Sequence, residues 1–402
     1  MPTPELSPVA LDFVRRGVVF DAHVDAIGRA VDLGCDLGLR GTSGHFDLVR
    51  AAEGGVGVWV NVLWVDPEQH LDRSFDRAVR MLRAVHELEA QHPDRFRLVG
   101  NAGQLDVARR AGLIGGIPSI EGGHAIECDL GKLEWLFEHG LRGMTLVWNN
   151  HLPWIRSCQD GAGANVPPGI DEFGRAVVQL MNVCGMLVDV SHASERAFYD
   201  VVSASSAPVL ASHSGCKALH DHPRNLTNDQ LRTLAKHGGV CGIVFHPGFL
   251  DAEARAEEAR VRETAEYKNR AGANDAERFV SSQDVMRRQA RPMALKRLID
   301  HIVHAVEIAG VAHVALGSDF DGIERGPEGL EDASRYGVLL EALLQRGFTP
   351  SEVEQMAGLN LRRVFADATA IGTFAFVRTR ESIAAPSLDT VSGEAGQPAL
   401  SE

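Results

Sequence analysis

Eight short apolar runs alternate with helical patterns along this chain, and this alternation limits the possible folds more than any other feature. Each run is followed by turn residues and then by apolar residues at helical spacing, which predicts a parallel sheet with helical crossovers. Eight such units fit a closed barrel of the TIM type, a (β/α)8 fold of the α/β class, better than an open sheet. The runs lie at residues 18–25, 56–64, 113–121, 141–148, 185–192, 208–213, 239–246 and 314–319.

The segments between the runs support the same fold. With 402 residues the chain is long enough for one large barrel, and we expect a single barrel domain over residues 1–377. Helices are predicted from the spacing of their apolar residues at 67–92, 173–184, 195–205, 227–237, 292–309, 330–346 and 351–366.

Two segments depart from a bare barrel. Residues 251–290 are crowded with Ala, Glu and Arg and hold few large apolar residues, which predicts an exposed helical insertion over one barrel mouth, placed to act as a lid. Residues 378–402 are rich in Ser, Ala, Pro and Gly, so we expect a flexible tail there.

Six candidate site residues lie at the ends of five of the eight runs. In a parallel barrel these ends converge on the face where catalytic groups lie. One histidine in a buried strand is more often a core residue than a ligand, but six ionisable groups together would cost several kcal/mol for each unpaired buried charge. A bound cation would offset that cost. The six residues are His23, Asp25, Glu121, His192, His213 and Asp319.

The first run contains a pair of candidate ligands. Side chains alternate between the two faces of a strand, so His23 and Asp25 are predicted to lie on one face and to hold one cation with a nitrogen and an oxygen. The same alternation turns Asp21 toward that face.

The number of candidate ligands indicates two metal ions per chain. His23 and Asp25 can hold one, His192 and His213 the other, and Glu121 can bridge them through its two oxygens. Nitrogen and oxygen ligands without a thiolate favour zinc, with manganese, cobalt and iron as alternatives. A bridging hydroxide is the expected nucleophile, because coordination lowers the pKa of water from 15.7 to roughly 7.

Asp319 is the predicted proton shuttle of this site. It ends the last run, in Gly317-Ser318-Asp319-Phe320-Asp321-Gly322. From there it can take a proton from the attacking water and pass it to the leaving amine.

Charge and cysteine usage exclude several other functions. Acidic residues outnumber basic ones by 54 to 40, a net charge of -14, which argues against nucleic acid or an anionic membrane as the main partner. No stretch approaches the roughly 20 apolar residues of a membrane span, and residues 1–17 lack the pattern of a secretory leader, so we expect a cytoplasmic protein. The six cysteines show no CxxC spacing, so neither a disulfide framework nor a sulfur-ligated metal is predicted.

The motifs resemble those of the membrane dipeptidases, also called renal dipeptidases, which are zinc metallopeptidases on an amidohydrolase-like barrel. The resemblance spans about residues 20–365. It is carried by residues 21–25, Ile120-Glu121-Gly122-Gly123-His124, Asp189-Val190-Ser191-His192, Ser212-His213-Ser214, Pro223-Arg224-Asn225-Leu226, residues 317–322 and Pro327-Glu328-Gly329-Leu330-Glu331-Asp332.

This resemblance implies roles for individual residues. It implies that Asp319 is the general acid and base and that Arg224 receives the substrate carboxylate, for which a planar fork of donors is suited. It also implies homodimers. The implied ligands are His23, Asp25 and Glu121 for one zinc ion, and Glu121, His192 and His213 for the other.

The chain departs from the family after the fourth predicted strand. The family commonly has a histidine there that contacts the substrate, whereas Leu146-Val147-Trp148-Asn149-Asn150-His151 places Trp148 at that position. We expect Trp148 to border the substrate and His151 or Asn149 to replace the missing contact. If neither reaches the reacting carbonyl, the loss of such a donor costs about 100 to 1000 fold in turnover.

These features predict a zinc-dependent dipeptidase that hydrolyses the peptide bond of small dipeptides, with an L- or a D-residue on the C-terminal side. One alternative is a related binuclear amidohydrolase acting on another small amide or lactone. The other is an accessory barrel without hydrolytic activity, an alternative that Trp148 keeps open.

Overall fold

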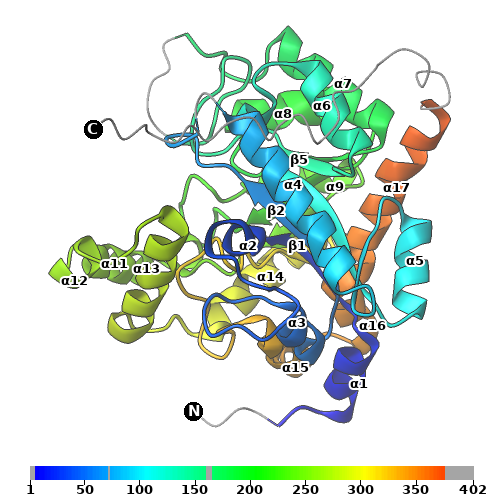
Figure 1. Cartoon of the computed structure of the whole chain (residues 1–402). Helices are drawn as coiled ribbons and strands as arrows, with labels where there is room; N and C mark the ends of the chain where they lie inside the picture. Colours follow the sequence, from blue (N-terminus) through cyan, green and yellow to red (C-terminus); the bar gives the residue numbers. More distant parts are fainter. Residues whose placement is uncertain (1–4, 71–72, 160–164, 376–402) are drawn as a thin grey trace, which may run out of the picture.

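Eight parallel strands form a closed barrel in the computed structural model, which describes residues 5–70, 73–159 and 165–375 (Figure 1). The strands pair in the order β2-β1-β9-β8-β7-β6-β5-β4, and pairing of β2 with β4 closes the ring. The predicted barrel and its eight strands are therefore confirmed. The strands are β1 (Val19–Val24), β2 (Val56–Trp64), β4 (Ile114–Glu121), β5 (Gly143–Thr145), β6 (Leu187–Asp189), β7 (Val209–Ser214), β8 (Val240–Ile243) and β9 (Val314–Leu316).

One further strand in the described part of the chain, β3 (Phe96–Leu98), pairs with β4 outside the ring. The apolar pattern does not predict it. The strands β5, β6 and β9 have three residues too, but they lie within longer apolar runs, whereas Phe96-Arg97-Leu98 does not belong to a run of the required four to eight residues.

Polar residues at two strand ends lie beyond the sheet rather than within it. β6 ends at Asp189 and β9 at Leu316, whereas the predicted strands extended to His192 and Asp319. The backbone of these two residues is left-handed, with φ of 67° and 62°. This conformation is unfavourable for residues other than glycine, and it clusters at functional sites, where the surrounding structure enforces it.

Helices surround the barrel (Figure 1). The predicted helices are present with altered ends, and that predicted at 67–92 begins only at Ser74. Five helices of seven to nine residues, α1, α2, α3, α5 and α6, are too short to show a clear period and were not predicted. The helices are α1 (Pro8–Arg16), α2 (Ile27–Leu33), α3 (Leu48–Gly54), α4 (Ser74–Gln91), α5 (Ala102–Arg110), α6 (Leu130–Glu138), α7 (Glu172–Cys184), α8 (Glu195–Ala204), α9 (Asn228–Lys236), α14 (Leu295–Ala309), α15 (Tyr336–Arg346), α16 (Pro350–Glu354) and α17 (Asn360–Ala375).

Side-chain caps fix the starts of the helices that follow the strands of the site. Asp171 and Ser194 accept hydrogen bonds from backbone N–H groups in the first turns of α7 and α8. Thr227 and Gln230 form a capping box at α9. Each cap satisfies a backbone donor that the helix leaves unpaired, so these sequences define where the strand-to-helix loops end.

The helix α17 closes the amino-terminal end of the barrel. Its buried apolar side chains form one cluster with residues from the first halves of the strands. The cluster joins Leu361, Val364, Phe365 and Ala368 of α17 to Phe20, Ala22, Val58, Val60, Ile117, Leu187, Leu210, Val240 and Ala315 of the strands. The carboxyl ends of the strands are left for the polar residues.

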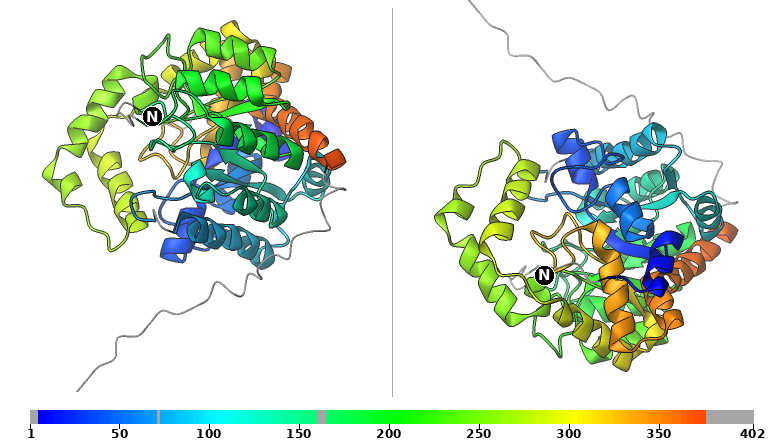
Figure 2. Two further views of the ribbon diagram at one scale, coloured as in Figure 1. Left: turned by 90° about the horizontal axis from the view of Figure 1, so that it is seen from above. Right: turned by 90° about the horizontal axis from the view of Figure 1, so that it is seen from below.

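The predicted insertion over the barrel mouth is confirmed as helical. It follows the short helix α10 (Pro247–Leu250) and comprises α11 (Ala252–Arg262), α12 (Ala265–Lys268) and α13 (Asp275–Gln289). These helices stand off to one side of the barrel in both views of Figure 2. The predicted tail at 378–402 lies outside the described residues. Among the described helices, none is both long and apolar enough to cross a membrane.

Candidate active site

Five side chains meet at the carboxyl end of the barrel, as predicted. Glu121 at the end of β4 places Oε1 2.9 Å from His192 Nε2 and 3.4 Å from His213 Nε2. Its other oxygen, Oε2, lies 3.6 Å from His23 Nε2, which is also 3.6 Å from Asp25 Oδ2. Each oxygen of Glu121 therefore faces at least one imidazole nitrogen.

The spacing of the donor atoms fits shared cations. Two nitrogens bound tetrahedrally to zinc at about 2.0–2.1 Å lie about 3.3 Å apart. His192 Nε2 and His213 Nε2 are 3.1 Å apart. The spacing of 3.6 Å from His23 Nε2 to Asp25 Oδ2 is slightly wider than one ion requires.

Unpaired polar atoms mark the same place. Within the described residues, His23 Nε2 and Asp25 Oδ2 are buried without a hydrogen-bond partner. The candidate ligand atoms form two groups, and within each group they all lie within 4.8 Å of one another. One group is His23 with Glu121 and His213, and the other is His23 with Asp25 and Asp319. Buried polar atoms without partners are costly, and a cation would satisfy them. These residues therefore fit a metal site.

The electrostatics of this cluster favour a positive charge at its centre. Burial alone would lower the pKa of His23, but Glu121 and Asp25 raise it to about 10. Burial would raise the pKa of Glu121, yet the three histidines hold it well below its ordinary value. The pKa of Asp25 is raised, first by burial and then by the neighbouring carboxylates.

Asp319 lies beside this cluster. Burial, together with Glu121, raises its pKa to about 7, although His23 and Arg224 act in the opposite direction. Its backbone N–H donates to His23 O at 2.9 Å, which ties the loop after β9 to β1. A Cβ at Gly322 would lie 2.2 Å from Asp319 Oδ1 and 2.5 Å from Asp25 Oδ2, so only glycine fits there.

Asp21 does not join the cluster of candidate ligands. The pairing of β1 with β2 shifts register between Asp21 and Val24. Asp21 accepts hydrogen bonds from the backbone N–H of Ser318 at 2.9 Å and from the Tyr336 hydroxyl of α15. It thereby holds the strand next to the loop that carries Asp319.

Arg224 lies in the wall of the site with unused donors. Its side chain is buried, and Nη2 donates to His213 O at 3.0 Å. Its guanidinium lies over the Phe249 ring at 5.4 Å. Nε has no hydrogen-bond partner among the described residues.

Trp148, Asn149 and His151, at and after the position where the family commonly has a histidine, have different surroundings. The ring of Trp148 lies against that of Trp64, with centroids 5.1 Å apart and planes tilted by 58°, and it lies 6.2 Å from the His192 ring. Asn149 Oδ1 lies 2.9 Å from His192 Nδ1, so this amide contacts a candidate ligand. His151 Nδ1 accepts the backbone N–H of Ser157 at 3.1 Å, and His151 is not among the described residues that line the main cavity.

A cavity of about 680 Å³ opens above the cluster. Its floor includes Asp25, Glu121 and Asp319, and Trp64 and Trp148 form part of one wall. The helical insertion contributes another part of the lining, as expected of a lid. Its lining residues are Arg270, Asn274, Ala276, Arg278 and Phe279.

Sequence reasoning did not assign Arg29 and Asp321, a buried ion pair that also lines the cavity. Arg29 Nη2 donates to Asp321 Oδ2 at 2.7 Å. The pair joins α2 to the loop after β9, two residues beyond Asp319. Asp321 belongs to the motif at 317–322, but an acidic residue in a turn carries no further signal of its partner.

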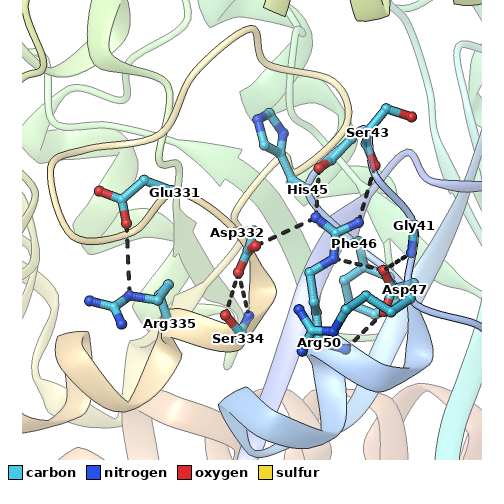
Figure 3. Close-up of polar contacts among 12 residues, drawn as sticks. Gly41, Ser43, His45, Phe46, Asp47, Arg50, Glu331, Asp332, Ser334 and Arg335 are labelled. Carbon is cyan, nitrogen blue, oxygen red and sulfur yellow. Dashed lines mark hydrogen bonds and ion pairs between the residues drawn. The ribbon is translucent and has the colours of Figure 1, made fainter. Parts of the chain in front are cut away.

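A network of polar contacts holds the loop between α2 and α3 in place (Figure 3). Arg50 of α3 donates to Asp47 Oδ2 and to Gly44 O, both at 2.7 Å, and lies 3.5 Å from Asp332 Oδ2. The loop then presents the backbone N–H of His45 to Asp321 Oδ1 at 2.6 Å. The network therefore connects the motif at 327–332 to the cavity floor.

Comparisons with known proteins identify the family of this chain. The sequence profile of the membrane dipeptidase family, peptidase family M19, matches residues 10–374. A relative from Schizosaccharomyces pombe, named uncharacterized dipeptidase C965.12, is 30% identical over 337 residues, which cover 81% of this chain and 73% of the relative.

Two solved structures share the fold. The probable dipeptidase PvdM from Pseudomonas aeruginosa superposes with a TM-score of 0.76 at 21% identity, over 90% of this chain and 98% of its own. A metallopeptidase from Rhodobacter sphaeroides, solved with a phosphinate mimic of the dipeptide L-Ala-D-Ala, gives 0.73 at 24% identity, over 87% and 99%. With the family profile covering nearly the whole barrel, the chain belongs to the membrane dipeptidase family of metallopeptidases, peptidase family M19.

Proposed function

We propose that this protein is a zinc-dependent dipeptidase that hydrolyses the peptide bond of free dipeptides. The observation that carries the proposal is the placement of Glu121, with His192 and His213 at one oxygen and His23 at the other. Membership of a metallopeptidase family supports it.

The ligands divide between two zinc ions. One would be held by His23, Asp25 and Glu121, and the other by Glu121, His192 and His213. Bound there, the ions would supply Lewis-acid activation of water and of the peptide carbonyl.

Asp319 moves the proton in this proposal. A carboxyl group with a pKa of about 7 can accept a proton and donate it again near neutral pH. Burial and the neighbouring Glu121 favour its protonated form, while the hydrogen bond with Asp25 favours the ionised one. Asp319 therefore protonates the amine of the departing residue.

Arg224 binds the free carboxylate of the dipeptide. Its guanidinium contacts His213 O and the Phe249 ring, its Nε has no hydrogen-bond partner among the described residues, and Arg224 lines the cavity. A planar fork of donors matches a carboxylate. Recognition at this end limits the substrate to short peptides with a free C-terminus.

The aromatic wall borders the substrate side chain. The Trp148 ring lies against Trp64, and Trp64 pairs with Glu121 at the end of β4. Asn149 contacts His192, so its amide holds a ligand in place. The solved relative with an L-Ala-D-Ala mimic supports including a D-residue on the C-terminal side among the substrates.

A panel of L-L and L-D dipeptides, assayed after zinc loading and metal analysis, tests the proposal. We expect two zinc ions per chain and release of both amino acids, and Glu121→Gln serves as the inactive control for contaminating peptidases. Turnover of another small amide or lactone, with none of any dipeptide, would assign the related amidohydrolase reaction. Fewer than two ions and no turnover would assign the accessory role.

A further inference from the structure

We propose that Ser212 is a positioning residue that holds the ring orientation of two metal-ligating histidines at once, one for each zinc ion. This inference rests on the proposed function, because it concerns the ligands of both ions. It is carried by the hydrogen bonds that converge on one hydroxyl group.

The hydroxyl of Ser212 has its proton directed to Asp189. Ser212 Oγ lies 2.6 Å from Asp189 Oδ2. The Asp189 carboxylate receives four donors, the backbone N–H groups of Ser191 and Ser212 at 2.9 Å each, and the hydroxyls of Thr145 at 2.5 Å and Ser212. Four donors fill its acceptor positions, so Asp189 only accepts, and the Ser212 hydroxyl is the donor in the hydrogen bond between them.

The remaining acceptor positions of Ser212 face two imidazole rings. Ser212 Oγ lies 2.7 Å from His213 Nδ1 and 3.1 Å from His23 Nδ1. A hydroxyl that has already donated can only accept, so both rings carry their proton on Nδ1 toward Ser212. Ser212 Oγ also lies 3.3 Å from Ser191 Oγ, which is longer than its contacts with Asp189, His213 and His23.

Protonation at Nδ1 leaves the Nε2 lone pair of each ring for a cation. His213 Nε2 and His23 Nε2 face different oxygens of Glu121, at 3.4 and 3.6 Å. The third histidine, His192, is held separately through Asn149. Partners of this kind fix the orientation of metal-bound histidines, and losing one costs about 10 to 100 fold in metal affinity.

Competitive chelator titration of the loaded chain measures this role without reference to activity. Ser212→Ala should weaken both zinc ions by about 10 to 100 fold. Thr145→Val removes another hydroxyl from the same Asp189 oxygen without touching a histidine, so it should leave both affinities near those of the wild type. Asn149→Ala should weaken only the ion bound by His192.

Asp189→Asn provides a second variant that keeps the shape of the site. The two backbone N–H groups at Oδ1 hold the amide oxygen there, which places the amide N–H₂ against Ser212 Oγ. Ser212 must then donate its hydroxyl proton to Nδ1 of one of the two histidines. That ring carries its own proton on Nε2 instead, so its Nε2 has no lone pair left for a zinc ion. We expect one tightly bound ion per chain in place of two.

Unchanged zinc affinity in folded Ser212→Ala would overturn the inference, as would an equal loss in Thr145→Val, since Asp189 would then act on its own. If Ser212→Ala does not fold, two tightly bound ions in Asp189→Asn would overturn it. A wild-type chain that binds fewer than two ions would instead refute the proposed function.

Discussion

Asp319 combines a buried carboxyl group with a left-handed backbone, and both properties suit a group that changes its proton in each cycle. The closely packed Gly322 keeps its carboxylate directed at the cluster. Asparagine can replace Asp319 without a change of shape, because an amide group is as large as a carboxyl group.

Asp319→Asn should retain both zinc ions and lose turnover by about 100 to 10,000 fold, because the amide neither accepts nor donates the transferred proton. Asparagine tolerates the left-handed backbone, so the fold should be kept. Metal analysis and steady-state kinetics check this. Asp66→Asn, which changes a carboxylate in the same cavity lining away from the cluster, is the matched control. Wild-type rates in Asp319→Asn would remove Asp319 from the reaction.

Arg224→Ala should raise the Michaelis constant for free dipeptides by about 10 to 150 fold, since a hydrogen bond to a charged group contributes about 1.5–3 kcal/mol. C-terminally amidated analogues, which lack the carboxylate, should be affected far less. Arg270→Ala, another arginine of the cavity lining, separates this effect from a general loss of positive charge. Equal effects on both substrate series would show that Arg224 binds no carboxylate.

Among the secondary-structure elements, α11 carries a titratable contact between the helical insertion and the barrel. Glu258 Oε1 accepts the backbone N–H of Gly248 at 3.2 Å and lies 3.6 Å from His246 Nδ1. Arg262 lies 3.7 Å from its other oxygen and also pairs with Glu324 at 2.8 Å. Burial raises the pKa of Glu258 to about 7.

Glu258→Gln should become more stable relative to the wild type as the pH rises from 5 to 8. Because the folded pKa of Glu258 lies above its ordinary value of 4.5, the folded state binds the extra proton between these values, and stability falls as the pH rises through the window. The glutamine removes this loss, which amounts to at most about 3 kcal/mol. Urea unfolding at several pH values measures it. A pH-independent difference between the two proteins would contradict the prediction.

The elements that were predictable from the sequence are those with a long apolar signal. β2 is buried along nearly its whole length and is an apolar run interrupted only by Gly57 and Asn61. The short helices α2 and α3 offer no such signal, because two turns show almost no period. The contacts of Asp21 with Ser318 and Tyr336 were also hidden, since these partners lie nearly 300 or more residues away in the sequence.

The candidate ligands were predictable because strand ends converge in any parallel barrel, whatever the loops do. The partners that orient them were not. Ser212 and Asp189 stand in matched motifs, yet a serine beside a histidine gives no sign that it contacts a second histidine from β1. Arg29 and Asp321 likewise meet only through the closed barrel.

In the whole molecule, the ligands join four separate strand ends, so metal and fold stabilise each other. Removal of zinc by a chelator should lower the melting temperature by about 3–5 °C. An ion present at 100 to 1000 times its dissociation constant contributes about 3–4 kcal/mol, and at about 2 cal/mol/K of unfolding entropy per residue each kcal/mol corresponds to about 1 °C in a chain of 402 residues. Calorimetry before and after zinc is restored checks this, and an unchanged transition would show that the cluster binds no ion.

The closure of the ring between β1 and β9 has a consequence for biosynthesis. β1 is complete once residue 24 has left the ribosome, but its partner on one side begins only at residue 314. At about 5–20 residues per second, that edge stays unpaired for roughly 15–60 s. Exposed strand edges recruit other chains, so the nascent protein passes through a period in which the strand bearing His23 needs protection from aggregation.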